Sequence, residues 1–312
     1  MKHQIDPKID CVFKALLGAE ENRNLLIHFL NAILSSDLLV PIETVDIINP
    51  YNDKEFLEDK LSIVDVKAKD ARGAIYQIEI QLVNFANLPE RILYNWADIY
   101  SQQLQSGDSY HELRPTYSIW LLAENLIKAD TDYIHTYKIR DNKGRVLNDH
   151  CGIWLLELDK FSIHQIDTEQ QRWLRFFKEG DQLNDEAGLP DWMTTGEMRQ
   201  AMSTLRQFSE KERDYHAYQA RQNYLREQLT RQYEFDEERK AKLEALQREQ
   251  VAKEREKVAL AEKQTAIAEK QAAIDEKQAA INEKQAAIDE KQAALEEIER
   301  LKSLLAKNHL DS

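Results

Sequence analysis

The sequence predicts an α/β fold in the first part of the chain and a long helical region in the second. All six prolines, all eight glycines and all five tryptophans lie at or before Gly196. The remainder is rich in Ala, Glu, Lys and Gln, which favour helices. Within the first part, segments of period two alternate with segments of helical spacing. We therefore predict a globular domain over residues 1–195 and a helical region over residues 196–312.

The first elements are predicted to be two helices and a short strand. Residues 10–17 carry apolar side chains at helical spacing and end at Gly18, and residues 24–34 form a second apolar helix. Residues 44–48 form a strand that the following Asn49-Pro50 closes.

A β-hairpin is predicted next, over Leu61–Leu82. Residues 62–67 and residues 76–82 each alternate between apolar and polar side chains, which is the pattern of a strand. Between them, residues 69–73 form a polar segment that ends in Gly73, and a glycine suits the positive φ of a tight turn.

The hairpin brings two carboxylates together. If it folds about Arg72, residues whose numbers sum to 144 face each other, so Asp65 lies opposite Glu79. Cβ atoms of such partners are about 4.5–5.5 Å apart, and two carboxylates this close repel each other unless a cation or a proton intervenes. Carboxylates bind hard divalent cations such as Mg²⁺. The pair therefore predicts a metal site; the alternative is a solvated sheet face that carries charges.

Further elements complete an αβββαβ order. A helix begins at Pro89, and its predicted apolar stripe runs from Leu93 to Leu104 through Trp96, Ala97 and Tyr100. Residues 117–122 are almost continuously apolar, as in a strand buried on both faces. Further elements are predicted at residues 133–140 and 153–158 (strands near the sheet edge), and at 170–177 and 197–208 (helices). The result is a mixed sheet flanked by helices.

Seven-residue repeats occupy residues 262–296. The copies open at Glu262, Glu269, Glu276, Glu283 and Glu290. A strict period of seven is typical of helices that supercoil. With Ile or Leu at every d position, each a position is Gln, so the apolar seam is thin. Lys270 and Asp275 have the g-to-e spacing that pairs parallel chains. We predict self-association through a parallel coiled coil; a solvated single helix is the alternative.

The charge and the apolar content limit the partners. A net charge of −14 argues against a protein that binds nucleic acid through long-range electrostatic attraction. A metal ion and a few basic residues could still bind DNA locally. No apolar run approaches the roughly 20 residues that span a bilayer. The first residues lack the apolar segment of a secretory signal. We therefore expect a cytoplasmic protein without a membrane partner.

Several short motifs occur in a fixed order. They are Asp10-Cys-Val-Phe13-Lys14-Ala-Leu-Leu-Gly18, Asn49-Pro50, Ser62-Ile-Val-Asp65-Val and Tyr76-Gln-Ile-Glu79-Ile-Gln81, then Arg91-Ile-Leu-Tyr94, Tyr100, Leu104, Gly107, Tyr110 and Pro115. Together they resemble the Rpn family of recombination-promoting nucleases, which are also described as transposases and belong to the PD-(D/E)XK nuclease superfamily. The resemblance covers residues 6–125 and extends more loosely to residue 180.

The resemblance implies a fold and an activity. The fold is a PD-(D/E)XK-type mixed sheet, and the activity is metal-dependent endonucleolytic hydrolysis of DNA phosphodiester bonds that promotes recombination. Mg²⁺ is the expected cofactor, with Mn²⁺ as a substitute. The metal-binding carboxylates correspond to Asp65 and Glu79, which the hairpin had already paired. The superfamily's lysine, two residues after the second acid, is Gln81 here. Glutamine can hold and orient a water, but it cannot carry charge or take up a proton near neutral pH.

Other residues could assist the predicted site. Lys67, on the same face as Asp65, or Lys60 could supply the missing cation, although both could equally be ordinary exposed lysines. Asp10 could reach the metal or cap its own helix. Arg91 could face the DNA or stabilise its helix.

A second class of function is also compatible with the sequence. The domain could be an inactive nuclease fold whose coiled tail joins chains or docks a partner, and the glutamine at position 81 favours that alternative. A full transposase would also recognise the ends of an element, yet no helix-turn-helix, zinc finger or basic stripe is evident.

Overall fold

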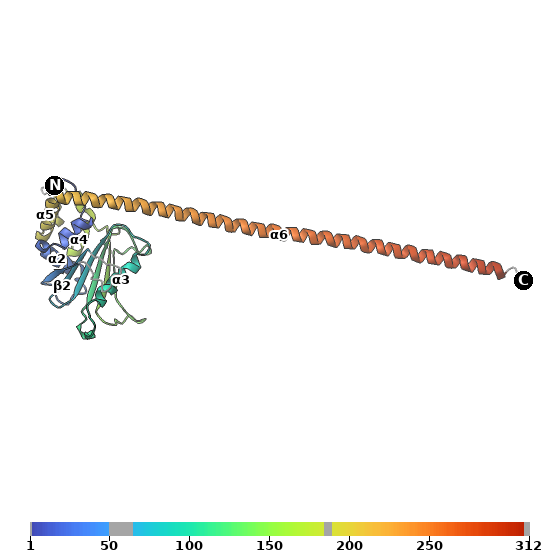
Figure 1. The fold of residues 1–312 in the computed structure, drawn as a ribbon, viewed down its shortest axis with the longest axis horizontal. Helices are drawn as coiled ribbons and strands as arrows, with labels where there is room; N and C mark the ends of the chain where they lie inside the picture. Colours follow the sequence, from blue (N-terminus) through green and yellow to red (C-terminus); the bar gives the residue numbers. More distant parts are fainter. Residues whose placement is uncertain (1, 50–64, 184–188, 309–312) are drawn as a thin grey trace. The chain divides into compact units, whose positions relative to one another are not determined.

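The structure is a computed structural model that describes the backbone of residues 2–49, 65–183 and 189–308. The chain forms two compact units, Met1–Arg231 and Gln232–Ser312. The first unit holds the sheet and most of the helices (Figure 1). The second contains the repeats. The described residues include no helix with an apolar stretch that could cross a bilayer, and the expected cytoplasmic location stays a prediction.

The predicted αβββαβ order is confirmed. The helices are α1 (Asp10–Leu17), α2 (Arg23–Ile33), α3 (Leu88–Ser101), α4 (Glu169–Glu179), α5 (Gly196–Glu210) and α6 (Glu212–Asn308). The strands are β1 (Val45–Ile48), β2 (Val66–Asp70), β3 (Ile75–Gln81), β4 (Thr116–Leu122), β5 (Ile134–Tyr137) and β6 (Cys151–Glu157). Short 3₁₀ turns lie at Glu20–Asn22, Tyr110–Glu112, Gly180–Gln182 and Asp191–Met193.

The strands form a six-stranded mixed sheet in the order β1-β2-β3-β4-β6-β5. β3, β4 and β6 are parallel to one another, and β1, β2 and β5 pair antiparallel with their neighbours. Pairing on both sides buries β4 and β6 along almost their full length, as the apolar run of residues 117–122 predicts.

The predicted register of the hairpin is confirmed. Val66 pairs with Ile78 and Lys67 with Gln77, so the numbers of facing residues sum to 144. The first strand is displaced relative to its prediction, because β2 continues to Asp70 while residues 50–64 lie outside the described part of the chain. The turn therefore follows Asp70, and Gly73 has the expected positive φ of 87°.

The two faces of the sheet carry separate cores. One core contains side chains of α1, α2, α4 and α5, among them Phe13, Phe29 and Trp173. The other lies under α3 and includes Trp96 and Trp120. Helices therefore flank the sheet on both faces, as predicted (Figure 1).

The predicted apolar stripe of α3 is rotated from the observed one. Leu93 is 57% exposed and Ala97 is exposed, whereas Ile92 and Ile99 are buried together with Trp96. Both stripes fit a spacing of three and four residues. Trp96, whose indole donates a hydrogen bond to the Thr116 carbonyl (2.9 Å), belongs to both stripes, so the observed face is set by the packing of Leu88 and Ile92 beside it in the core under α3.

The change in composition and the end of the compact unit lie at different positions. Composition changes near residue 195, but α5 and the first turns of α6 still pack on the globular domain. Met198 and Leu205 of α5 join the core, and Tyr218 of α6 accepts a hydrogen bond from the Asp6 amide (3.1 Å). Helical residues poor in Gly, Pro and Trp therefore still complete the core of the first unit.

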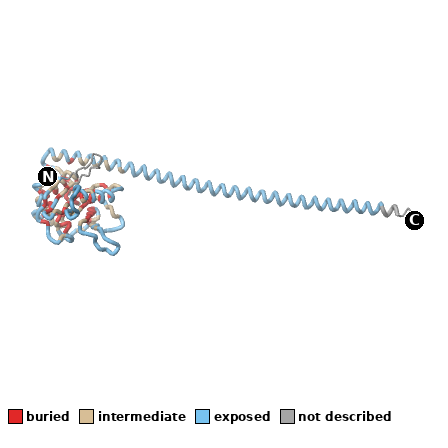
Figure 2. Tube along the Cα trace, turned by 60° about the horizontal axis from the view of Figure 1, so that its bottom comes forward, coloured by how far each residue is buried: buried red, intermediate tan, exposed pale blue. Residues whose placement is uncertain are grey.

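The second unit is helical throughout its described residues. Every side chain from Tyr233 to Ser303 is exposed (Figure 2). Within the repeats, Gln side chains donate hydrogen bonds to Asp or Asn four residues later. These pairs are Gln271–Asp275, Gln278–Asn282 and Gln285–Asp289. Such pairs each stabilise a single helix by about 0.2–0.5 kcal/mol, a contribution that the sequence prediction overlooked.

The turn that sets the hairpin register can be tested at Gly73. A Cβ there would have a positive φ and would lie 3.0 Å from the Arg114 Cγ. We expect Gly73→Ala to lower the free energy of unfolding by about 1–2 kcal/mol, measured by urea denaturation. Gly196→Ala is the control, because its Cβ would enter open space in a helix. A Gly73→Ala protein as stable as the wild type would contradict this account.

Candidate metal centre at the hairpin

Two acidic side chains meet where β2 begins and β3 ends. Asp65 immediately precedes β2, and Glu79 lies near the carboxyl end of β3. Continuing the observed register by one residue places Asp65 opposite Glu79. The Ile80 amide donates a hydrogen bond to the Asp65 Oδ2 (3.0 Å), which fixes the aspartate against β3. The structure thus brings the predicted carboxylate pair together.

The environment of Glu79 disfavours its ionised form. The residue is only 3% exposed. Burial raises the pKa of the Glu79 carboxyl well above its usual value, and the charge of Asp65 raises this pKa further. Arg91 acts in the opposite direction but does not offset both effects. When Glu79 is ionised, the pair carries more negative charge than its protein neighbours compensate, and either a proton or a bound cation would relieve the repulsion.

A chain of hydrogen bonds orients Glu79 from the neighbouring strand. The Trp120 Nε1 donates to the Ser118 Oγ (2.8 Å), and the Ser118 hydroxyl donates to the Gln77 Oε1 (3.2 Å). The Gln77 Nε2 then donates to the Glu79 Oε1 (3.4 Å). All four residues lie on the face of the sheet that α3 covers, because Gln77 pairs with Ser118 and Glu79 with Trp120.

Two basic side chains approach the carboxylates from helices on opposite faces of the sheet. Lys14 of α1 forms an ion pair with Asp65, with 3.2 Å between Nζ and Oδ1. Arg91 of α3 lies near Glu79 and donates from Nη1 to the Gln81 Oε1 (3.3 Å). The Arg91 guanidinium carbon lies 5.6 Å from the centroid of the Trp120 ring. Each acid therefore has a different cation beside it.

Gln81 lies at the end of β3 with both ends of its amide engaged. Its Nε2 donates to the Val83 carbonyl (2.6 Å), and its Oε1 accepts from Arg91. A carbonyl oxygen has two lone pairs, so Oε1 can still accept a bond from a water.

The remaining predicted residues have different positions. Lys67 pairs with Gln77 and shares the face of Asp65. Lys60 lies outside the described residues. Asp10 is the first residue of α1; its Oδ1 accepts from the Cys11 amide and lies 2.9 Å from the Arg221 Nε. The structure therefore joins Asp10 to α6 rather than to the carboxylate pair.

The donor set fits a small hard cation. Among the residues that the structure describes, no group of three or more His, Cys, Asp or Glu is arranged around one point. A Mg²⁺ site needs only one or two carboxylates, since water and substrate phosphate complete its shell. The absence of imidazole and thiolate from the pair disfavours softer metals.

Sequence reasoning missed part of this arrangement. Lys14 and Arg91 both belong to motifs named above, yet their approach to the acids depends on how two helices pack on the sheet. The Trp120–Ser118–Gln77 chain depends on the parallel register of β3 and β4, for which a single sequence offers no signal. Only the antiparallel hairpin was predictable from local pattern.

Comparison with known proteins agrees with the geometry. The family model for PD-(D/E)XK nuclease family transposases matches residues 7–233, which is more than half of the chain. The chain belongs to the PD-(D/E)XK nuclease family of transposases. The match spans the whole sheet and all helices up to the first turns of α6. No curated protein and no solved structure matches the chain significantly.

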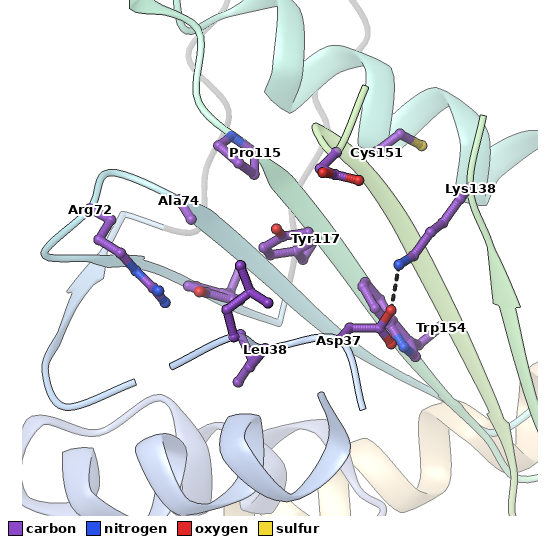
Figure 3. Close-up of a pocket in the computed structure, with 12 residues that line it drawn as sticks. Asp37, Leu38, Arg72, Ala74, Pro115, Tyr117, Lys138, Cys151 and Trp154 are labelled. Atoms are coloured by element: carbon purple, nitrogen blue, oxygen red, sulfur yellow. Dashed lines mark hydrogen bonds and ion pairs between the residues drawn. The ribbon is translucent and has the colours of Figure 1, made fainter. Parts of the chain in front are cut away.

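A separate cavity of about 340 Å³ lies elsewhere on this nuclease domain (Figure 3). Tyr76, Tyr117 and Trp154 line it from the sheet, and Lys138 and Asp37 form an ion pair at its rim. Tyr76 alternates with Gln77 and Glu79, so the cavity faces the opposite side of the sheet, near the start of β3. It is therefore distinct from the carboxylate site.

Glu79 makes stability depend on pH. Its pKa is higher in the folded protein than in the unfolded chain, so the unfolded chain loses this proton first as pH rises. The stabilisation by the protonated carboxyl is complete below the unfolded pKa and is lost as pH rises through the folded pKa. Glu79→Gln should match the wild type at acid pH and become more stable at higher pH. The gain should be about 1.4 kcal/mol per unit of pKa elevation.

Urea unfolding at a series of pH values, with a chelator present, measures this difference. Glu90→Gln is the control, because it makes the same chemical change at an exposed residue of α3. A Glu79→Gln protein that loses stability relative to the wild type as pH rises would refute the assigned environment.

Proposed function

We propose that the domain is a metal-dependent DNA endonuclease that hydrolyses phosphodiester bonds. The observation that carries the proposal is the pairing of Asp65 with the buried Glu79 at the carboxyl end of β3. In α/β sheets, ligands bind outside the carboxyl ends of strands. Membership of a nuclease family supports nucleic acid as the substrate class. Strand cutting would expose the ends that recombination uses, so a role in DNA recombination is part of the proposal.

The proposed site assigns a role to each residue. Asp65 and Glu79 would hold a divalent cation, Mg²⁺ with Mn²⁺ as a substitute. When bound, such an ion supplies Lewis-acid polarisation of the phosphoryl oxygen and activation of water. Gln81 would orient the attacking water through its second lone pair. Gln77 would hold Glu79 in place, and Lys14 would limit the repulsion on Asp65.

Cation binding should be visible without any activity. A ligand that binds only the folded state at 100 times its dissociation constant stabilises by about 2.7 kcal/mol. We expect Mg²⁺ or Mn²⁺ to raise the melting temperature of the wild type and to leave that of Glu79→Gln unchanged. Equal stabilisation of both proteins would favour the second candidate, a non-catalytic module, for which the uncharged Gln81 is the supporting observation.

Cleavage is tested with supercoiled plasmid. The wild type should convert it to nicked or linear DNA in Mg²⁺, and a chelator should abolish the conversion. Asp65→Ala should lower the rate at least about a hundredfold, and its melting temperature is measured beside that of the wild type because the substitution also removes the bonds to Lys14 and the Ile80 amide. The control variant is Asp108→Ala, at an exposed position before β4. Equal nicking by purified Asp65→Ala would end the endonuclease proposal.

We also propose that the repeats of α6 join two copies of the chain in parallel. The supporting observation is an apolar stripe of period seven that is between 53% and 58% exposed. It comprises Ile267, Ile274, Ile281, Ile288 and Leu295. The Gln–Asp bonds within the helix oppose this proposal, since they already satisfy the a and e positions that a partner would use.

Light scattering of the intact protein tests the proposal. The wild type should have the mass of a dimer. Replacing Ile274, Ile281 and Ile288 with Gln should give a monomer, because it removes the apolar seam but keeps good helix formers. The matched control replaces Ala273, Ala280 and Ala287, at c positions, with Gln. A monomeric wild type would refute self-association.

A further inference from the structure

The side chain at position 81 positions an arginine. The family resemblance places a lysine two residues after the second acid, and this chain has Gln81 instead. In the structure, the Gln81 Oε1 accepts a hydrogen bond from the Arg91 Nη1 (3.3 Å), while the Gln81 Nε2 is anchored on the Val83 carbonyl. The residue that replaces the lysine is thus a fixed acceptor for a cation from another element.

Arg91 is held over the site from two directions. Gln81 bonds one end of the guanidinium, and the Trp120 ring supports its face at 5.6 Å. Trp120 pairs with Glu79 in the parallel ladder, so the guanidinium lies beside the second acid and favours its ionised form. Its helix, α3, begins only a few residues after β3 ends, and this short connection limits where the side chain can lie.

We propose that Arg91 supplies the positive charge for which the superfamily uses a lysine. This inference rests on the proposed endonuclease function. Arg91 would bind a non-bridging oxygen of the scissile phosphate and stabilise the charge that accumulates there in the transition state. Guanidinium has five N–H donors and fits phosphate oxygens in pairs. The bond to Gln81 uses one donor, and Arg91 is exposed, so the remaining donors are accessible to a substrate.

The other basic residues are placed less well for this role. Lys14 has its charge paired with the Asp65 carboxylate rather than bonded to the side chain at position 81. Lys67 lies opposite Gln77, two residues before Glu79 on β3 and further from the strand's carboxyl end. Arg91 is the described cation that contacts the side chain at the lysine position itself.

The chemistry assigned to Arg91 is electrostatic. In the hydrolysis, the water oxygen bonds to phosphorus and the bond from phosphorus to the 3′ oxygen breaks. One proton of the water passes to solvent, and the departing 3′ oxygen takes up another. Arginine stays protonated throughout the accessible pH range and takes no part in these proton transfers. Its effect is therefore expected on the rate of the chemical step rather than on substrate affinity.

The experiment compares single-turnover plasmid cleavage by the wild type, Arg91→Gln, Arg91→Lys, Gln81→Lys and the double variant Gln81→Lys/Arg91→Gln. Arg91→Gln should lower the maximal rate about 10²–10³-fold, with half-saturation by DNA changed less than about threefold. Arg91→Lys should retain more activity than Arg91→Gln. The double variant should recover at least about tenfold over Arg91→Gln, because a lysine at position 81 restores the charge.

Controls separate a local structural role from a role in the reaction. Arg145→Gln is the matched control, because the Arg145 side chain is 75% exposed and pairs with Asp141 in a loop away from the acids. Mg²⁺ should still raise the melting temperature of Arg91→Gln, which shows that the variant is folded and binds the cation.

The outcomes distinguish this inference from the proposed function. A wild type without Mg²⁺-dependent cleavage overturns both. If the wild type cuts and Asp65→Ala does not, the endonuclease stands. In that case Arg91 loses its role if Arg91→Gln keeps more than a third of the maximal rate. The role is equally overturned if Arg91→Gln loses activity only through DNA affinity, or if the double variant shows no recovery.

Discussion

The pairing of β2 with β3 is the constraint on which the site depends. Backbone hydrogen bonds in this one register set Asp65 beside Glu79, and a shift of one residue would turn one of the two carboxylates to the opposite face. The strand pairing stabilises the sheet while it forces two like charges together. The cost is visible in the raised pKa of the Glu79 carboxyl, which burial and Asp65 together produce. The proposed cation would relieve this repulsion.

Helices α1 and α3 bring basic side chains to the carboxylate pair that the hairpin forms. α1 packs on one face and brings Lys14 to Asp65, whereas α3 packs on the other and brings Arg91 to Gln81. Polar side chains of β3 and β4 connect the site to the core under α3, because the hydrogen-bond chain that reaches Glu79 starts at the buried Trp120. The packing of α1 and α3 on the two faces of the sheet therefore also determines which charged side chains surround Asp65 and Glu79.

Local patterns predicted most of the fold and, in the candidate site, the pairing of Asp65 with Glu79. Period-two alternation and a turn glycine were enough for the hairpin, because antiparallel neighbours are adjacent in sequence. The buried face of α3 was not predictable, since two stripes that share Trp96 fit its spacing and only the tertiary packing of Leu88 and Ile92 on the sheet distinguishes them. The positions of Lys14 and Arg91 likewise require tertiary packing. The change in composition near residue 195 does not coincide with the end of the first unit, because α5 has no Gly, Pro or Trp after Gly196 and yet contributes Met198 and Leu205 to the core.

The uniform repeats of α6 give the second unit an adjustable length. An α-helix rises about 1.5 Å per residue, so each added or lost copy changes the rod by about 10.5 Å. Because a copy has seven residues, each added copy keeps the apolar stripe on the same side of the helix except for a rotation of about 20° per copy. Recombination between near-identical copies of the repeat in the gene would thus change the length of α6 in steps of about two helical turns. The sequence of the sheet and of its two acidic residues would stay the same.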